Sequence, residues 1–332
     1  MEVTTRAIRT WADEKGIPDL TLAELDYRLT HALQAIYSDP FLADRLYLKG
    51  GTALNKFYIP NQGRLSVDLD FNAVGARERV LDERTQFSQR TMNVLAQQDE
   101  EYDFTYRWRY DQATVYARYR PVTGVAQQRL KVEISFVERF AILEPVGKTL
   151  SIPTSESQVT VNTYRLEELT STKLRALYGR RKGRDIYDLF RIADHELNHA
   201  AVRKMVLYYF YRAYQIFHYS TFVANVEQKI AKRSFRDDVR GLIRTGTSLD
   251  WPAACERVLD YYVFLDEMDD RDWLFMDLAK SLLRKPSPDI SVEIIQDVEH
   301  PLAWLMEGVP ISKEAAGKTV EDIQVHLPDA GE

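Results

Sequence analysis

Apolar residues follow a helical spacing in some parts of the chain and alternate with polar residues, as in strands, in others. Near the N-terminus, apolar residues recur every three or four positions, which predicts a helix that ends before Pro40. Its apolar residues are Leu22, Leu25, Leu29, Leu33 and Ile36. Thr21 and Glu24 are spaced for a capping box at the start of this helix. Helices are also expected over residues 5–15 and, as one long polar stretch, over residues 77–97.

Alternation of apolar and polar residues predicts strands in the first half of the chain. The strand stretches are residues 46–49, 64–72, 102–110, 114–120 and 130–136. After residue 161 the alternation gives way to helical spacing. We therefore predict an α+β protein, with a small mixed-sheet domain over residues 1–161 and an α-helical domain over residues 162–332.

Composition narrows the functional class. The 332 residues are enough for two domains with cores of their own. The net charge of -6 does not indicate a protein that attracts nucleic acid over its whole surface, so RNA binding would need a local basic patch. The single Cys255 excludes an intrachain disulfide and fits a reducing cytoplasm. Neither a signal peptide nor an apolar run of about 20 residues is evident, so we expect no membrane association.

A glycine turn follows the first predicted strand. The strand ends at Lys49 and breaks at Gly50 and Gly51 into a helix. Paired glycines allow a sharp turn and close approach to a ligand. Thr52 is expected to cap the new helix with its hydroxyl, and the free N–H groups at the helix start would suit a phosphate.

Two carboxylates lie on one face of the next predicted strand. Ser66, Asp68 and Asp70 point to one side, whereas the apolar residues between them point to the other. Adjacent carboxylates repel each other unless a cation lies between them, and hard divalent cations prefer oxygen ligands. A phosphate-binding turn followed by this pair predicts metal-assisted phosphoryl or nucleotidyl transfer.

A third carboxylate is expected from Glu133, which shares a strand face with Lys131 and Ser135. In the favoured interpretation Asp68, Asp70 and Glu133 bind two Mg²⁺ ions about 4 Å apart, which activate a ribose 3′-hydroxyl and stabilise the leaving pyrophosphate. In the alternative, Lys131 and Glu133 form a solvated pair on an edge strand.

Six basic residues lie close together in the predicted helical half: Lys173, Arg175, Arg180, Arg181, Lys182 and Arg184. They belong to two consecutive helices. One interpretation is a solvated helical hairpin with an ion pair between Arg184 and Asp188, four residues apart. The other is a phosphate-binding wall opposite the carboxylates, with Lys173 on a triphosphate. The chemistry of the residues leaves both open.

The motifs taken together resemble a known family. They are Lys49-Gly-Gly-Thr-Ala-Leu54, Arg64-x-Ser66-x-Asp68-x-Asp70-Phe71, and Lys173-x-x-Ala-Leu177 with Arg180-x-x-x-Arg184-Asp185-x-x-Asp188-Leu189. The first two resemble the polymerase-β-like nucleotidyltransferase superfamily. With the third, the chain resembles the AbiEii/AbiGii nucleotidyltransferase toxins, a group that includes the MenT toxins.

The resemblance implies a mixed-sheet nucleotidyltransferase domain followed by a helical domain that closes the cleft. It implies transfer of a nucleotide from an NTP, with Mg²⁺ or Mn²⁺, to an RNA acceptor, which in characterised relatives is the 3′ end of tRNA. It also implies a neighbouring antitoxin and a role in toxin–antitoxin control or abortive phage infection. We expect a monomer.

Site residues follow from the resemblance by position. Asp68 and Asp70 would bind metal, with Glu133 matched by pattern only, and Lys173 and Asp188 would be essential to catalysis. The residues expected to bind nucleotide are Lys49, Gly50, Gly51, Thr52, Ser66, Lys173 and Arg184.

Alternative functions remain open at this point. The enzyme could modify a small molecule or a protein hydroxyl, or the chain could be a non-catalytic NTP-binding regulator. The aromatic run Tyr208-Tyr-Phe-Tyr211 could stack on RNA bases, but aromatic residues at helical spacing are more often core, which is the interpretation we favour.

Overall fold

The computed structural model describes residues 3–60, 63–109, 111–153, 155–244, 249–283 and 298–324. The chain forms two compact units. The first comprises Met1–Ala141, Pro145–Tyr164 and Val239–Ser248; the second comprises Ile142–Glu144, Arg165–Asp238 and Leu249–Glu332. None of the helices in the described residues is long and apolar enough to span a membrane.

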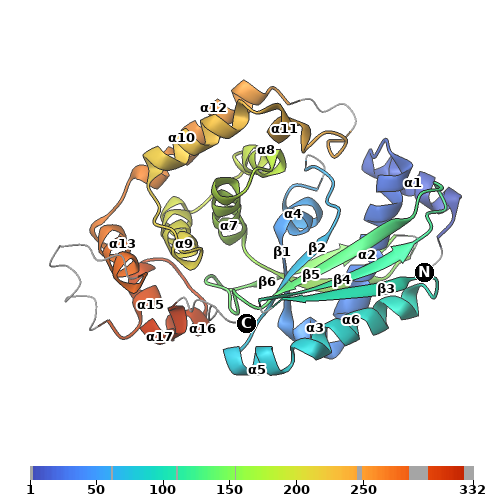
Figure 1. The fold of residues 1–332 in the computed structure, drawn as a ribbon, viewed down its shortest axis with the longest axis horizontal. Helices are drawn as coiled ribbons and strands as arrows, with labels where there is room; N and C mark the ends of the chain where they lie inside the picture. Colours follow the sequence, from blue (N-terminus) through green and yellow to red (C-terminus); the bar gives the residue numbers. More distant parts are fainter. Residues whose placement is uncertain are drawn as a thin grey trace. The chain divides into compact units, whose positions relative to one another are not determined.

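A mixed sheet forms the centre of the first unit (Figure 1). Its seven strands among the described residues are β1 (Leu46–Lys49), β2 (Leu69–Ala73), β3 (Asp103–Arg109), β4 (Gln112–Tyr119), β5 (Gln128–Ser135), β6 (Val146–Ser151) and β7 (Gln158–Thr163). Their spatial order is β3-β4-β5-β2-β1-β7-β6. β2 runs parallel to β5 and β1 to β7, and the other neighbours are antiparallel. The predicted α+β class with a mixed sheet is confirmed.

Two long helices of the first unit, over residues 20–38 and 84–98, cover one face of this sheet. The helices of the first unit are α1 (Thr5–Lys15), α2 (Leu20–Ser38), α3 (Pro40–Arg45), α4 (Gly50–Ala53), the π-helix η1 (Leu54–Tyr58), α5 (Arg77–Asp82) and α6 (Arg84–Gln98). α2 contacts β5 and β7, and α6 contacts β4. Leu130, Val132 and Ile134 of β5 are therefore completely buried.

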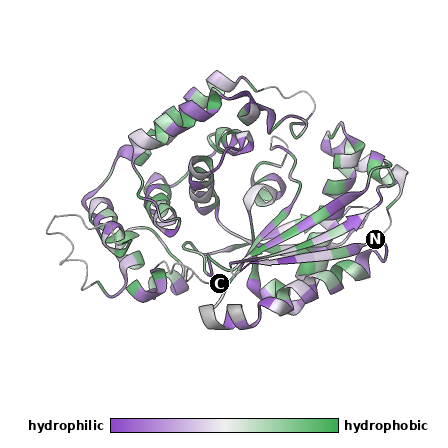
Figure 2. Cartoon of the chain, viewed as in Figure 1, coloured by the Kyte–Doolittle hydropathy of each residue, from purple (hydrophilic) through white to green (hydrophobic). Residues whose placement is uncertain are grey.

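The residues of β5 that alternate with Leu130, Val132 and Ile134 point to the opposite face of the sheet. We call it the carboxylate face because it carries Asp70 and Glu133. On β5 its residues Arg129, Lys131 and Glu133 are exposed or half-buried. Figure 2 shows hydrophilic and hydrophobic residues alternating along the strands. This alternation is the one expected for a sheet that buries one face against helices and leaves the other more polar.

The second unit is built from helices. Its described helices are α7 (Leu166–Gly179), α8 (Gly183–Ile192), α9 (His199–Arg212), α10 (Tyr219–Ile230), α11 (Arg233–Asp237), α12 (Trp251–Tyr261), the 3₁₀ helix η2 (Tyr262–Asp266), α13 (Asp270–Leu282), α15 (Pro301–Leu305), α16 (Lys313–Ala316) and α17 (Val320–Ile323). The residues of the predicted aromatic run on α9 are at most 3% exposed, which confirms that they are core.

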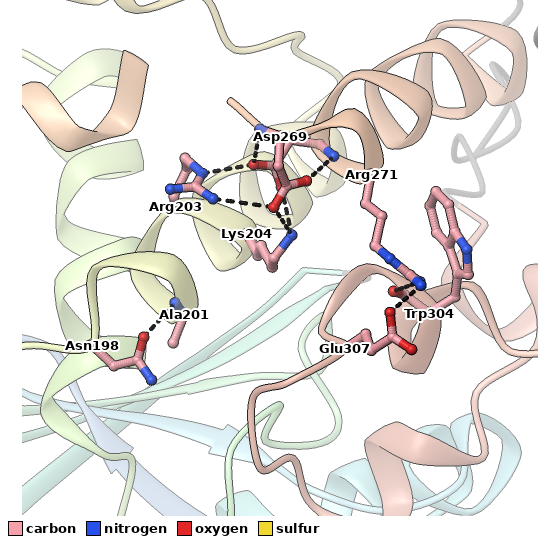
Figure 3. A network of polar contacts seen from close by, with 9 residues as sticks. Asn198, Ala201, Arg203, Lys204, Asp269, Arg271, Trp304 and Glu307 are labelled. Carbon is pink, nitrogen blue, oxygen red and sulfur yellow. Dashed lines mark hydrogen bonds and ion pairs between the residues drawn. The ribbon is translucent and has the colours of Figure 1, made fainter. Parts of the chain in front are cut away.

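Buried charges fix α9 to the start of α13 (Figure 3). The Arg203 Nε lies 2.6 Å from the Asp272 Oδ2, and the Lys204 Nζ lies 2.8 Å from the Asp269 Oδ2 and 3.0 Å from the Asp272 Oδ1. Asp269 also caps α13, because its side chain accepts from the Asp272 backbone N–H. Removing one partner from this largely buried network would leave uncompensated charge, so the network fixes how α9 packs on the start of α13.

Several predicted boundaries are wrong. Asp19, not Thr21, caps α2, since its side chain accepts from the backbone N–H groups of Thr21 and Leu22. The predicted strand over residues 64–72 forms a ladder only from Leu69 onward, and neither β6 nor β7 was predicted. The predicted polar helix is two helices, α5 and α6, with a break at Glu83.

Candidate active site

Three carboxylates meet on the carboxylate face of the first unit. One ligand oxygen from each of Asp68, Asp70 and Glu133 lies within 4.8 Å of the others. The sheet register explains this, because β2 pairs with β5 so that Asp70 is the partner of Glu133. In-register neighbours lie about 4.8 Å apart and point to the same face. Asp68 directly precedes β2 and lies on the same side. The structure thus brings together the three predicted metal ligands.

The electrostatics of this cluster favour a bound cation. Burial, followed by the Asp68 and Glu133 carboxylates, raises the pKa of Asp70 to about 7. The Lys131 ammonium contacts Glu133 and lies 3.8 Å from the Asp68 Oδ2, and the Gln112 amide donates to Glu133. Burial alone would lower the pKa of Lys131, but Glu133 and then the two aspartates raise it. Three close carboxylates and one ammonium leave excess negative charge, which fits a divalent cation.

In the alternative interpretation of Glu133, the pair with Lys131 is confirmed and the edge position of the strand is wrong. Lys131 and Glu133 do form a pair, but β5 lies between β4 and β2 and is not an edge strand. Glu133 therefore lies inside the sheet, beside Asp70.

The glycine turn brings the backbone against two side chains. Gly50 has φ +73°, and a Cβ there would lie 2.7 Å from the Asp70 Oδ2. A Cβ on Gly51 would lie 2.5 Å from the Arg64 Nη2. A side chain at Gly50 would displace Asp70, so this glycine is needed for the geometry of the carboxylate cluster. A side chain at Gly51 would displace the Arg64 guanidinium instead.

The hydroxyl of Thr52 does not cap the helix as predicted. Lys49 is the N-cap residue, and no side chain caps α4. Thr52 is 1% exposed, and its Oγ1 lies 2.8 Å from the Ser66 Oγ and donates to the Asp68 carbonyl. Thr52 and Ser66 thus hold the segment before β2 against the glycine turn. The Lys49 ammonium donates to the Asn72 amide oxygen and lies 3.7 Å from the Glu138 Oε2.

The predicted residues of the second unit form an ion-pair network of their own. Lys173 is 4% exposed, and its Nζ lies 3.1 Å from the Asp185 Oδ1 and 2.7 Å from the Asp188 Oδ2. Arg180 binds the same Asp185 with two hydrogen bonds of 2.7 Å. Burial alone would raise the pKa of Asp185, but Lys173 and Arg180 hold it well below its usual range. The Arg184 Nε lies 3.8 Å from the Asp238 Oδ2, and Asp188 pairs with Lys173, so the predicted pair of Arg184 with Asp188 is wrong.

Sequence reasoning missed two residues. Lys131 was noticed only as a partner in the alternative interpretation of Glu133, although it contacts the carboxylate cluster. Asp185 belongs to the quoted motif but was given no role, although it joins Lys173 to Arg180. Its spacing of three residues from Asp188, on one helix face, was the available signal.

A glycine turn beside a three-carboxylate cluster on a mixed sheet fits a metal-dependent nucleotidyltransferase. The chain matches the profile of the "Nucleotidyl transferase AbiEii toxin, Type IV TA system" over residues 31–260, and it therefore belongs to this family of toxin nucleotidyltransferases. The predicted family and the predicted enzyme class are both confirmed.

One solved structure supports the fold, and two further ones are similar at a lower score. MenT4, a nucleotidyltransferase toxin from Mycobacterium tuberculosis, is similar with a TM-score of 0.58 and 19% identity, over 89% of this chain and 99% of that chain. A candidate nucleotidyltransferase and the protein JHP933, both from Helicobacter pylori, each have a TM-score of 0.46. They are 17% and 16% identical, over 73% and 80% of this chain and 93% and 94% of their own. A comparison with curated proteins finds no match.

Proposed function

We propose that this toxin-family enzyme transfers a nucleotide from an NTP to an RNA acceptor, the 3′ end of tRNA. The proposal places the reaction in the cytoplasm, assigns it to a monomer, and gives the enzyme a role in phage defence under the control of an antitoxin. The observation that carries it is the carboxylate cluster of Asp68, Asp70 and Glu133 beside the glycine turn.

The carboxylate cluster is the proposed metal site. Asp68, Asp70 and Glu133 would hold Mg²⁺, which Mn²⁺ can replace, because oxygen ligands in a negatively charged cluster suit these hard cations. The bound metal would supply stabilisation of the charge on the leaving pyrophosphate and a lower pKa for the attacking hydroxyl. The Lys131 ammonium would balance the remaining negative charge from the edge of the cluster.

The glycine turn is the proposed site for the triphosphate. Gly50 and Gly51 keep the backbone free of side chains there, and Lys49 offers a positive charge at the same turn. Thr52 and Ser66 would act mainly by fixing the turn relative to Asp68, because their hydroxyls bond to each other and to the Asp68 carbonyl.

The predicted contribution of the second unit to nucleotide binding and catalysis comes from Lys173, Arg184 and Asp188. Closure of the cleft by the helical domain also stays a prediction. In this structure each of the three residues is engaged in an ion pair within the second unit. To bind Lys173, a triphosphate would have to displace a carboxylate from its ammonium group. The contribution of Lys173 to NTP binding therefore has to be measured.

The test is transfer of label. Purified protein is incubated with each α-labelled NTP in turn, Mg²⁺ and total tRNA, and the label is followed on a denaturing gel before and after removal of the 3′-terminal nucleotides. Label at the tRNA 3′ end that disappears with EDTA supports the proposal. Label that appears only in protein or in a small molecule would contradict the RNA acceptor while keeping the enzyme class.

A further inference from the structure

The carboxylate face continues beyond the metal cluster onto two further strands. Across the sheet, Glu133 of β5 pairs with Thr114 of β4, and Thr114 pairs with Arg107 of β3. In-register partners point to the same face, so Arg107 shares the face of Glu133. By the same argument Arg109 lies on this face, opposite Gln112, whose amide donates to Glu133.

Three arginines of this face have no acidic partner among the described residues. Arg107 and Arg109 are exposed and form no ion pair with any residue that the structure describes. The exposed Arg129 guanidinium lies 4.9 Å from the centre of the Tyr116 ring, a contact that leaves its charge uncompensated. A fourth arginine of the face, Arg118, pairs with Asp103 at 3.3 Å. We call Arg107, Arg109 and Arg129 the arginine strip.

The distance between the arginine strip and the cluster suits a polynucleotide. Arg107 is two strands away from Glu133, which corresponds to roughly 10 Å between the backbones. This distance corresponds to about three nucleotides at a rise of ~3.4 Å per stacked nucleotide. None of the three arginines forms an ion pair with the carboxylates, and this spacing lets the strip reach the backbone of an acceptor whose 3′ end lies at the cluster.

We propose that the arginine strip binds the backbone phosphates of the acceptor RNA just before its 3′ end and so directs that end to the carboxylate cluster. The inference rests on the proposed function and names the surface by which the enzyme recognises its acceptor. Arginine suits this task because its planar guanidinium donates two hydrogen bonds to one phosphate. The contacts would be independent of base sequence, because phosphates carry no sequence information.

The experiment reverses the charges of the strip in the full chain. The variant Arg107→Glu with Arg109→Glu is compared with the wild type and with a matched control, Arg6→Glu with Arg9→Glu. The control arginines are exposed on α1 of the same unit, and they too form no ion pair with a described residue. Binding of fluorescent total tRNA is measured at several salt concentrations, and NTP binding with Mg²⁺ is measured separately. Arg107→Gln with Arg109→Gln repeats the test without added negative charge.

Affinity for tRNA should fall by about tenfold or more in the strip variant, with a slope against log salt that is flatter by ~0.7 to 0.9 for each arginine removed. The glutamine variant should show the same flattening. NTP affinity should stay within twofold of the wild type, because the strip does not line the metal cluster. The control should match the wild type in every measurement.

Two failures can be told apart. If the wild type labels tRNA, but the strip variants bind tRNA with wild-type affinity and salt slope, the arginine strip is not the acceptor surface and the proposed function stands. If the wild type neither binds nor labels tRNA with any NTP, the RNA acceptor itself is wrong and the inference falls with it.

Discussion

Two regions of the protein carry clustered basic residues, and they differ in how much of that charge is available. On the helix pair α7 and α8, six basic residues lie within residues 173–184. Carboxylates of the same unit neutralise much of this charge: Lys173, Arg180, Lys182 and Arg184 pair with Asp185, Asp188 or Asp238. On the carboxylate face of the first unit, the arginine strip is spread over residues 107–129, yet its charges have no acidic partner among the described residues.

The difference shows that charge density along a sequence is a poor guide to a binding surface. Helical spacing places Asp185 and Asp188 against Lys173, so this part of the helix pair neutralises itself. Sheet register instead collects arginines from separate strands on one face. What attracts a polyanion is the charge that remains after such internal pairing. Three measurements would break or sharpen this comparison.

The largest effect is expected at the centre of the carboxylate face. Asp70→Asn should reduce nucleotide transfer to background, because it removes one of three charged metal ligands. The variant should stay folded, since the amide has the shape of the carboxylate and removes repulsion from Asp68 and Glu133. Transfer is measured with labelled NTP, and folding is checked by urea unfolding.

Asp103→Asn is the matched control for that measurement. Asp103 is an exposed carboxylate at the far end of the same face, and it pairs with Arg118 rather than with the cluster. It should keep wild-type transfer. Full activity in the Asp70→Asn variant would show that the cluster is not the metal site.

On the helix pair, the main expected effect is on stability. Lys173→Met should lower the free energy of unfolding by about 3 to 5 kcal/mol, because it removes the ammonium from a buried ion pair with the carboxylate of Asp188. Arg180 would still neutralise Asp185 in this variant. Urea unfolding measures the loss, and a change below about 1 kcal/mol would contradict the structural role. NTP affinity of the same variant, measured at low temperature, tests the predicted contact of Lys173 with the triphosphate.

A much smaller effect is expected from the exposed part of the helix pair. Lys182 is 47% exposed and pairs with Asp238 at 3.1 Å, so Lys182→Ala should change stability by less than about 1 kcal/mol. Affinity for tRNA should change less than twofold, because the lost charge was already balanced by Asp238. Arg107→Ala is the comparison in the same binding assay. If Lys182→Ala flattened the salt slope as much as Arg107→Ala, the helix pair would be an RNA-binding surface after all.

Local patterns predicted much of the fold. The spacing of Leu29, Leu33 and Ile36 correctly predicted α2, since residues three or four apart on a helix share its buried face. Alternation likewise predicted β3, β4 and β5 to within two residues at their ends. The errors concern residues whose hydrogen bonds are decided by neighbours distant in sequence. The segment before Leu69 looked like a strand, but Leu65 bonds to the Leu242 carbonyl instead of a sheet neighbour.

By itself, then, the sequence determined the elements, the family motifs and the residue types of the carboxylate cluster, because these depend on short-range spacing and on side-chain chemistry. Only the tertiary structure decided which residues are neighbours across strands and helices. Parallel pairing of β2 with β5 put Glu133 beside Asp70, and the same ladder extended the face to Arg107. Packing of α8 on α7 placed Asp185 and Asp188 against Lys173. Coulomb interactions depend on distance in space, so the availability of a charge cannot be read from its position in the chain.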